Sequence, residues 1–133
     1  MADYELPDEA HYTENDEWIR AEGDDLYRVG VSDYAQQQLG DVVFVELPAV
    51  GDRFDAGQPF GVIESVKAVS DLYAPVDLEI VEVNAALEDA PETVNADCYG
   101  AGWLLAVRVE RPDDVEGLLD SVAYRQHIAA RAK

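Results

Sequence analysis

The chain has 133 residues, 48% of them hydrophobic, and its 29 acidic and 9 basic residues give a formal net charge of -20. This length and apolar content are typical of one compact domain, so we expect a single domain over residues 1–133. A surface this acidic excludes nucleic acid and anionic membranes as partners, because neutralising phosphate groups takes a basic patch that the chain lacks.

Further features of the composition narrow the class of protein. No window approaches the roughly 20 consecutive apolar residues of a membrane helix, and the acidic leader, residues 1–11, lacks the apolar core of a signal peptide. We therefore expect a soluble, cytoplasmic protein. The single cysteine, Cys98, excludes an internal disulfide and a multi-cysteine zinc site, and we expect a buried or half-buried, unreactive thiol. Acidic residues are dispersed and arginine outnumbers lysine, which indicates an acidic surface adapted to a high-salt cytoplasm.

The first elements after the leader read as a hairpin and a helix. Residues 17–31 hold two short apolar runs around the turn-forming EGDD, which predicts a β-hairpin with its bend at Gly23 and Asp24. The segment that follows predicts a short helix, with Ser32 as its N-cap and Gly40 at its C-terminal end.

The middle of the chain predicts further strands. Residues 41–65 mix branched apolar with polar residues and break at PAVGD and DAGQP, so we expect strands separated by turns. A strand over residues 79–83 and one helical turn opened by Pro91 and Glu92 follow. The nearly continuous apolar run GWLLAVRVE predicts a buried strand.

The last part of the chain, residues 112–133, has a helical pattern. Ser121 is the predicted cap of its final helix, and Arg131 and Lys133 suit the negative end of the helix dipole. The strands come too close together for crossover helices, which disfavours a parallel sheet. We therefore expect a mainly β domain with helices at its edges.

The segment GVIESVKAVSD contains Lys67, and the only other lysine is Lys133. An ordinary lysine is a solvated charge, but the apolar run around Lys67 is too long for one strand of about 5 or 6 residues, so it must fold back. No Asn-Gly or Asp-Gly marks the turn, and the central pair, Val66 and Lys67, has poor turn propensity. Residues with poor turn propensity at the place where the chain must turn are typical of a functional position.

ESVKA, residues 64–68, is preceded by LGDVVFVELPAVGD and followed by YAPV, EIVEVNAALEDAPETVN and YGAGWL. Together these segments resemble the H protein of the glycine cleavage system, from about Tyr12 to the C-terminal helix. The resemblance implies a lipoyl-domain-like barrel-sandwich hybrid of two small antiparallel sheets with short peripheral helices, including C-terminal ones. It also implies that Lys67 lies at a hairpin tip and is the lipoyl attachment site. The motif recognised around it would comprise Glu64, Ser65, Val66 and Ala68.

In the family that the chain resembles, a lipoyl-lysine arm shuttles the aminomethyl intermediate of glycine between enzymes. The resemblance implies as partners the PLP-dependent glycine decarboxylase (P protein), the folate-dependent aminomethyltransferase (T protein) and dihydrolipoyl dehydrogenase (L protein), which reoxidises the dithiol. A lipoate ligase or transferase would attach lipoate covalently to Lys67. The cofactor carries the chemistry, so we expect a non-catalytic carrier without catalytic residues.

Four alternatives compete with this interpretation. A biotin carrier would place methionines beside the lysine, where this chain has Val66 and Ala68. A 2-oxo-acid dehydrogenase lipoyl domain would read ETDKA and would lack the EWI hairpin and the C-terminal helices. An H-like protein that mainly relays lipoate to other lipoyl domains stays open, as does a purely structural β-sandwich module with an ordinary Lys67.

Two acids carry further hypotheses. Glu64 and Asp71 flank Lys67, and their ordinary role is solubility, but we hypothesise that Glu64 helps the lipoyl ligase to dock. Glu17 occupies a family position near the stored arm, and we hypothesise that it helps to hold the protonated aminomethyl group. Both hypotheses rest on the resemblance.

The remaining candidate residues are structural or depart from the family. His11 and His127 have no ligand-like spacing, so we expect no metal site, while Trp18 and Trp103 are expected core anchors. Family members commonly read HEW, DHAQ and PVSGE. This chain has other residues in place of the two histidines and the glycine, namely Asp16, Tyr34 and Leu78, so the arm's resting pocket and one turn are expected to differ.

Overall fold

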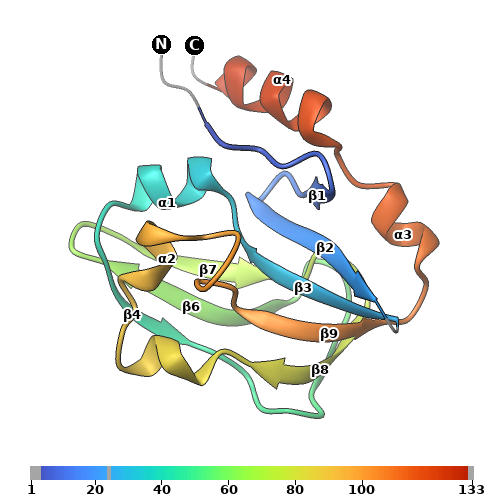
Figure 1. The fold of residues 1–133 in the computed structure, drawn as a ribbon, viewed down its shortest axis with the longest axis horizontal. Coiled ribbons are helices and arrows are strands. Elements are labelled where there is room, and N and C mark those ends of the chain that lie inside the picture. The colour runs from blue at the N-terminus through green and yellow to red at the C-terminus, as the bar shows by residue number, and fades with distance from the viewer. Residues whose placement is uncertain (1–3, 24, 132–133) are drawn as a thin grey trace.

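The computed structural model describes residues 4–23 and 25–131, which form two antiparallel sheets edged by short helices (Figure 1). The larger sheet has six strands in the order β1-β2-β3-β9-β8-β5, and the smaller has three in the order β4-β6-β7. The expected mainly β class is confirmed. The strands are β1 (Ala10–Tyr12), β2 (Glu17–Gly23), β3 (Leu26–Val31), β4 (Val42–Glu46), β5 (Arg53–Phe54), β6 (Pro59–Ser65), β7 (Val69–Tyr73), β8 (Leu78–Val83) and β9 (Leu105–Val109).

The helices are short and lie outside the sheets (Figure 1). The Ser32 side chain accepts a hydrogen bond from the Ala35 N–H and caps the first of them, and Gly40 ends it with φ at 77°. Both predicted caps of this helix are therefore confirmed. The helices are α1 (Asp33–Leu39), the 3₁₀ helix η1 (Ala85–Glu88), α2 (Thr93–Ala96), α3 (Asp113–Glu116) and α4 (Ser121–Arg131).

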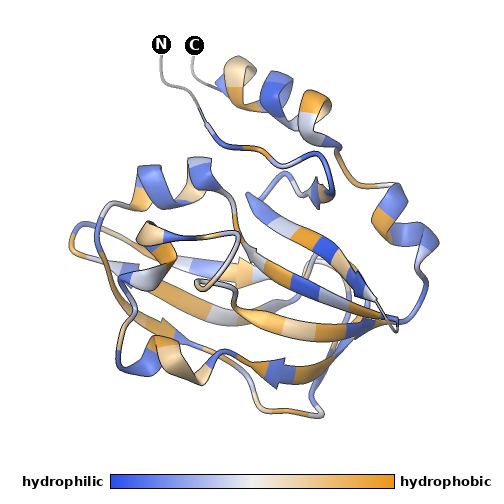
Figure 2. Ribbon diagram, in the orientation of Figure 1, coloured by the Kyte–Doolittle hydropathy of each residue, from blue (hydrophilic) through white to orange (hydrophobic). Residues whose placement is uncertain are grey.

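The main hydrophobic core lies between the two sheets. Ile19 and Val29 reach it from the larger sheet, while Ile63 and Leu72 reach it from the smaller one, and each is at most 2% exposed. Apolar residues recur among hydrophilic ones along β2 and β3 (Figure 2), and β2 contributes Ile19 to this core and the adjacent Trp18 to a second cluster. Burial of apolar surface between the sheets is the principal stabilising force of this fold.

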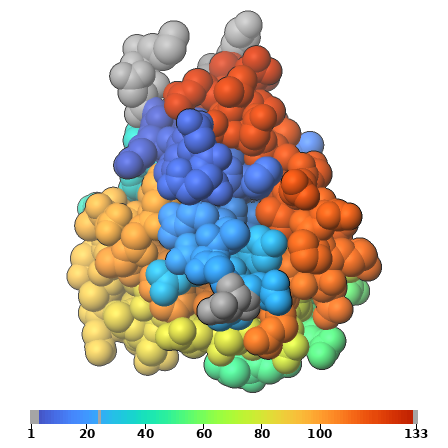
Figure 3. Space-filling view, turned by 45° about the vertical axis from the view of Figure 1, so that its right-hand side comes forward, coloured from blue at the N-terminus to red at the C-terminus, as the bar shows by residue number. Residues whose placement is uncertain are grey.

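A second, aromatic cluster joins the N-terminal segment to α4. The rings of Tyr12 and Tyr124 stack with their centroids 4.7 Å apart, and Trp18 is fully buried beside them. Tyr12 also exchanges backbone hydrogen bonds with Leu119, just before α4. Figure 3 shows the N-terminal segment lying against the C-terminal helices. The two ends of the described chain thus cover the outer side of the β2–β3 hairpin.

The predicted hairpin over residues 17–31 is confirmed as β2 and β3, with Gly23 at φ 97°, whereas Asp24 lies outside the described residues. One cap prediction is wrong. Asp120, not Ser121, caps α4, because its carboxylate accepts the Ala123 N–H at 2.8 Å. Ser121 is the first helical residue, and its hydroxyl donates to Asp8 instead. Arg131 ends the helix as expected, and Lys133 lies outside the described residues.

Leu78 does not occupy a strained turn, contrary to the expectation from the family's glycine. It begins β8, pairs with Phe54 and Val109, and is 1% exposed in the core. Its φ is negative, since Asp16 and Asp25 are the described non-glycine residues with positive φ. The leucine is thus accommodated as an ordinary strand residue. Over the described part of the chain, no helix is long and apolar enough to cross a membrane.

Candidate functional site

The hairpin that carries Lys67 joins β6 to β7, and residues 66–68 form its turn. The Ser65 N–H donates to the Ala68 carbonyl oxygen at 2.8 Å. The Ser65 hydroxyl accepts from the backbone N–H groups of Ala68, at 3.1 Å, and of Lys67, at 3.3 Å. The predicted fold-back at this place is confirmed, and the serine supplies the local hydrogen bonds that a typical Asn-Gly turn would not need.

The tip is also fixed to the neighbouring loop. The Val66 N–H donates to the Asp41 carbonyl oxygen at 3.0 Å, which ties the turn to the segment between α1 and β4. Lys67 itself is exposed, and its ammonium group forms no ion pair with the carboxylates of residues 4–23 and 25–131. The lysine stem lies beside Gly40, where a Cβ atom would come within 3.4 Å of the Lys67 Cε. The structure therefore presents a solvent-accessible primary amine on a firmly held turn.

Apolar side chains surround the tip on the outer face of the smaller sheet. Phe44 pairs with Glu64 and Glu64 pairs with Val69, so these three residues share one row and one face. Phe44, Val66 and Val69 are large hydrophobic residues that are nevertheless exposed. Glu64 lies half-buried between Phe44 and Val69, whereas Asp71 is exposed further along β7. The lysine is thus bordered by apolar surface that contains one acid.

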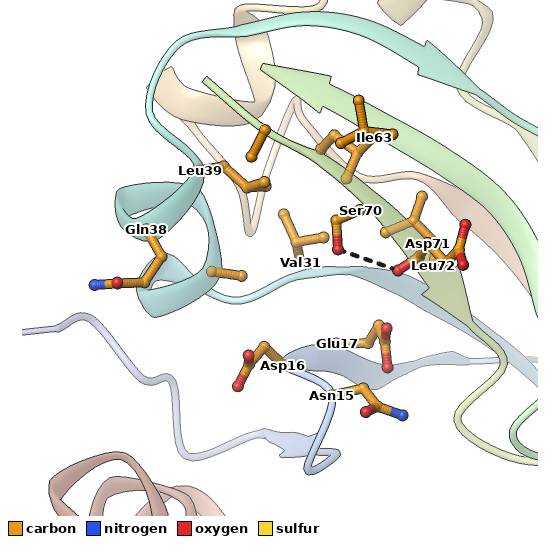
Figure 4. Close-up of a pocket in the computed structure, with 13 residues that line it drawn as sticks. Asn15, Asp16, Glu17, Val31, Gln38, Leu39, Ile63, Ser70, Asp71 and Leu72 are labelled. Atoms are coloured by element: carbon orange, nitrogen blue, oxygen red, sulfur yellow. Dashed lines mark hydrogen bonds between the residues drawn. The ribbon is translucent and has the colours of Figure 1, made fainter. Parts of the chain in front are cut away.

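A cleft of about 280 Å³ begins beside the tip and follows β7. Its walls are α1, the open edge of β7, and the segment that leads into β2 (Figure 4). Leu39 and Val69 line it near the lysine, and Asn15, Glu17 and Asp71 line it further away. Strands advance about 3.3 Å per residue, so the far end is on the order of 13 Å from the lysine. The cleft can hold a narrow, extended chain that starts at Lys67.

Glu17 is buried at the far end of this cleft, with 2% of its surface exposed. Its Oε1 accepts the Thr13 hydroxyl at 2.7 Å, and its Oε2 accepts the Tyr73 N–H at 3.1 Å. Burial raises the pKa of Glu17 to about 7, although both hydrogen bonds act in the opposite direction. No basic side chain among the described residues pairs with it. An acid in this setting favours a cationic ligand.

Asp16, which lines the same cleft, takes part in a contact network that sequence reasoning missed. Its carboxylate binds the Arg131 guanidinium and accepts the Tyr124 hydroxyl at 2.8 Å. The Arg131 guanidinium also lies over the Tyr34 ring, 4.8 Å from its centroid. Two positions that depart from the family pattern, Asp16 and Tyr34, are therefore joined through α4. The positive φ of Asp16, 73°, has no clear sequence signal.

The other candidate residues are structural. The described residues contain no group of three or more potential metal ligands, and His11 and His127 lie on β1 and α4. Burial raises the pKa of Cys98 to about 12, so its thiol stays protonated and unreactive, as expected. Trp18 is a core anchor, as predicted, and its Nε1 donates to the Cys98 carbonyl oxygen. Trp103 is only partly buried and lies under the Arg28 guanidinium, so that prediction is half right.

The fold and the tip define a class of protein, namely a small β domain of two antiparallel sheets that presents an exposed lysine on a hydrogen-bonded hairpin turn. Comparison with known proteins agrees. The family described as "Glycine cleavage H-protein" matches residues 10–131, and the chain belongs to this family.

Relatives match nearly the whole chain. A probable glycine cleavage system H protein of Natronomonas pharaonis is 55% identical over 95% of this chain and 98% of its own. Glycine cleavage system H proteins of Mycobacterium tuberculosis and Chromohalobacter salexigens are 51% and 50% identical over 91% and 94% of this chain, and over 95% of theirs. A crystal structure of a glycine cleavage system H protein from Mycobacterium marinum is 43% identical and has a TM-score of 0.85. It covers 93% of this chain and 99% of its own.

The family membership fixes the activity. The protein is a non-catalytic, lipoyl-bearing carrier of the glycine cleavage system, with lipoate attached covalently to a lysine. It works with the glycine cleavage enzymes and shuttles the aminomethyl intermediate of glycine between them. The residues of the tip suit a lipoyl group, because the Lys67 amine is accessible and a cleft extends from the tip.

Proposed function

We propose that Lys67 is the lysine that carries lipoate. The single observation that supports this most strongly is the placement of an exposed, unpaired amine at the tip of a hydrogen-bonded hairpin. Lys67 is also the only lysine among residues 4–23 and 25–131. Attachment forms an amide between the lipoate carboxyl group and the Lys67 Nζ. Gly40 lies beside the base of the arm, since a Cβ atom there would meet the Lys67 Cε at an ordinary van der Waals distance of 3.4 Å.

The residues around Lys67 have separate roles in this proposal. Glu64, Val66 and Ala68 form the surface that a lipoate ligase or transferase recognises. Ser65 acts indirectly, because its hydroxyl holds the turn that presents the amine. The further partners proposed are the PLP-dependent glycine decarboxylase, the folate-dependent aminomethyltransferase and dihydrolipoyl dehydrogenase. The expected cytoplasmic location stays a prediction.

We also propose that the cleft beside β7 receives the arm and that Glu17 binds the cationic amine at its end. When bound, lipoate supplies the sulfur that carries the aminomethyl group. The extended arm is similar in length to the path from Lys67 to the far end of the cleft. Glu17 is buried, lacks a basic partner among the described residues, and retains lone pairs for a cation. Asp71 adds a second negative charge along the same wall.

The attachment site is tested by substitution and intact mass. The Lys67→Arg variant is incubated with a lipoate ligase, ATP and lipoate, beside wild type and Lys133→Arg. We expect the lipoyl mass on wild type and on Lys133→Arg, and none on Lys67→Arg. Lipoylation of folded Lys67→Arg would overturn the assignment. Near-ultraviolet circular dichroism checks that all three proteins are folded.

A further inference from the structure

The Thr13 hydroxyl forms three hydrogen bonds next to the cleft. It donates to the Glu17 Oε1 at 2.7 Å, and it accepts from the backbone N–H groups of Asn15, at 3.2 Å, and of Glu17, at 3.1 Å. A hydroxyl has one proton and two lone pairs. Both lone pairs of Thr13 are therefore occupied by N–H donors, and its proton must point at the carboxyl group of Glu17.

The other fixed neighbour of this carboxyl group is also a donor. The Tyr73 N–H, on the open edge of β7, donates to the Glu17 Oε2 at 3.1 Å. Neither the Tyr73 amide nor the saturated Thr13 hydroxyl can accept a proton from a neutral Glu17. Protonation of the carboxyl group would weaken one of these bonds, because the hydroxyl oxygen of a carboxylic acid is a poorer acceptor than a carboxylate oxygen, so both neighbours favour the carboxylate.

The charged groups described near Glu17 either favour its neutral form or are already paired with another residue. Asp16 directly precedes Glu17 in the chain and is bound by Arg131, and Asp71 lines the same cleft on β7. Burial also favours the neutral acid. Among the described residues the hydrogen bonds from Thr13 and Tyr73 are thus the strongest interactions that favour the ionised side chain, and of these only the Thr13 bond can be removed by a side-chain substitution.

We propose that Thr13 is a positioning residue of the carrier, whose hydroxyl keeps the Glu17 side chain ionised and oriented so that a cationic amine on the arm is retained at neutral pH. The inference rests on the proposed role of Glu17. It adds that Thr13 sets the pH range in which Glu17 can hold the amine. Glu17 binds a cation only when it is deprotonated. Retention is therefore lost as pH falls through the pKa of Glu17, and losing the Thr13 bond moves that loss to higher pH.

The first test measures the ionisation of Glu17 directly in the full, unloaded chain. Proteins labelled with ¹³C at the glutamate δ carbon are titrated by NMR, and the Glu17 signal is the one missing from Glu17→Gln. We expect Thr13→Val to raise the pKa of Glu17 by about one unit. Thr13→Ser, which keeps the hydroxyl, should titrate as wild type does. A folded Thr13→Val with an unchanged Glu17 pKa would overturn the inference, as would Thr13→Ser that shifts as far as Thr13→Val.

The second test follows the amine itself. The lipoylated carrier is loaded from glycine by the decarboxylase, and loss of the group is followed against pH as formaldehyde and ammonium. Water supplies the oxygen of formaldehyde, the C–S and C–N bonds break, and the sulfur returns as a thiol. In Thr13→Val the pH of half-maximal retention should rise by the same amount as the Glu17 pKa.

Failures of the two proposals are distinguishable. If Glu17→Gln retains the amine as wild type does, the role of Glu17 is wrong, whatever Thr13 does to its pKa. If Glu17→Gln loses the amine quickly while Thr13→Val matches wild type in both tests, only the inference on Thr13 is wrong. Trp18 fluorescence and near-ultraviolet circular dichroism establish that each variant is folded. Should Thr13→Val not fold, Thr13→Ala removes the same hydroxyl with less bulk and is judged by the same two outcomes.

Discussion

Glu17 lies inside the protein without a basic partner among the described residues, and its protonation therefore depends on pH near neutrality. Its pKa is about 7 in the folded chain, against an ordinary value of 4.5. Between these values the folded state binds more protons than the unfolded state, so this group lowers the free energy of unfolding as pH rises. The stability lost is about 3 kcal/mol; the loss builds up between roughly pH 4.5 and pH 7, is complete above pH 7, and does not occur below pH 4.5.

Glu17→Gln should remove this pH dependence. Urea unfolding of wild type and Glu17→Gln at pH 5 and pH 8 gives the comparison, because other acids contribute equally to both proteins. The variant should lose less stability than wild type on going from pH 5 to pH 8. Identical pH dependence in the two proteins would mean that Glu17 ionises normally in the folded chain.

Glu64 is the acid closest to the lysine on the outer face, in one row with Phe44 and Val69. If a lipoate ligase docks on this surface, Glu64→Ala should lower kcat/KM for lipoylation by about tenfold, which corresponds to about 1.4 kcal/mol. Asp71→Ala is the matched control, since it removes an exposed acid on the same hairpin. A normal rate of lipoylation for Glu64→Ala would remove Glu64 from the recognition surface.

At this scale the sequence predicted the fold-back at Lys67, whereas it gave little information on the side-chain contacts around the cleft. A lysine in an overlong apolar run is visible as a local conflict, and the resemblance then supplied the cofactor. The bond from Thr13 to Glu17 and the contact of Arg131 with Asp16 depend on side-chain directions. The second of these joins residues far apart in the chain, and neither follows a local pattern.

Among the elements, β4 and β6 approach most closely at Gly61. A Cβ atom there would lie 2.2 Å from the Glu46 carbonyl oxygen, so the two strands would have to separate. We expect Gly61→Ala to lower the free energy of unfolding by about 1–3 kcal/mol, because strain of this kind displaces backbone. Gly117→Ala is the control, since its Cβ atom would meet only ordinary contacts and its φ is -79°. Equal stability of the two variants, measured by urea unfolding, would contradict the close approach.

The sequence predicted the boundaries of a helix correctly where only one residue at each end was a good capping residue. Ser32 and Gly40 define α1 because an N-cap hydroxyl and a left-handed glycine have few substitutes. Before α4 the chain offers two adjacent candidates, Asp120 and Ser121, and either can cap a helix. The choice is made by the contact of Ser121 with Asp8, which lies at the other end of the chain. Where two neighbouring residues have similar capping propensity, a long-range contact of this kind determines which of them caps the helix.

For the whole molecule, a net charge of -20 means that folding brings many like charges together. Salt screens them, with a Debye length of about 10 Å at 0.1 M and about 30 Å at 0.01 M. We expect the melting temperature to fall by several degrees on going from molar to millimolar KCl, because each 1 kcal/mol lost corresponds to a few degrees in a chain of this size. Sucrose in place of salt is the control, since it does not screen charge. An unchanged melting temperature would count against a salt-adapted surface.

The division into two sheets was predictable in outline. Short strands spaced by turns indicated an antiparallel β protein, and the resemblance indicated two sheets. Which strands join which sheet was not predictable from pattern, because β5 pairs with β8 and β3 pairs with β9, far along the chain. The six-to-three partition also leaves β7 as an edge strand, whose Tyr73 N–H is free for Glu17.

The fixed turn around Lys67 limits how partners share the protein. Four backbone hydrogen-bond donors, those of residues 65–68, are engaged at the tip, so an arm on Lys67 would swing only about its own single bonds from a stationary base. Even a 100-residue domain has a radius of gyration of about 13 Å, so the tip has no room for two enzymes to enclose it together. Partners must take turns, and each encounter has to end before the next begins. Rapid dissociation is thus as necessary to this carrier as recognition.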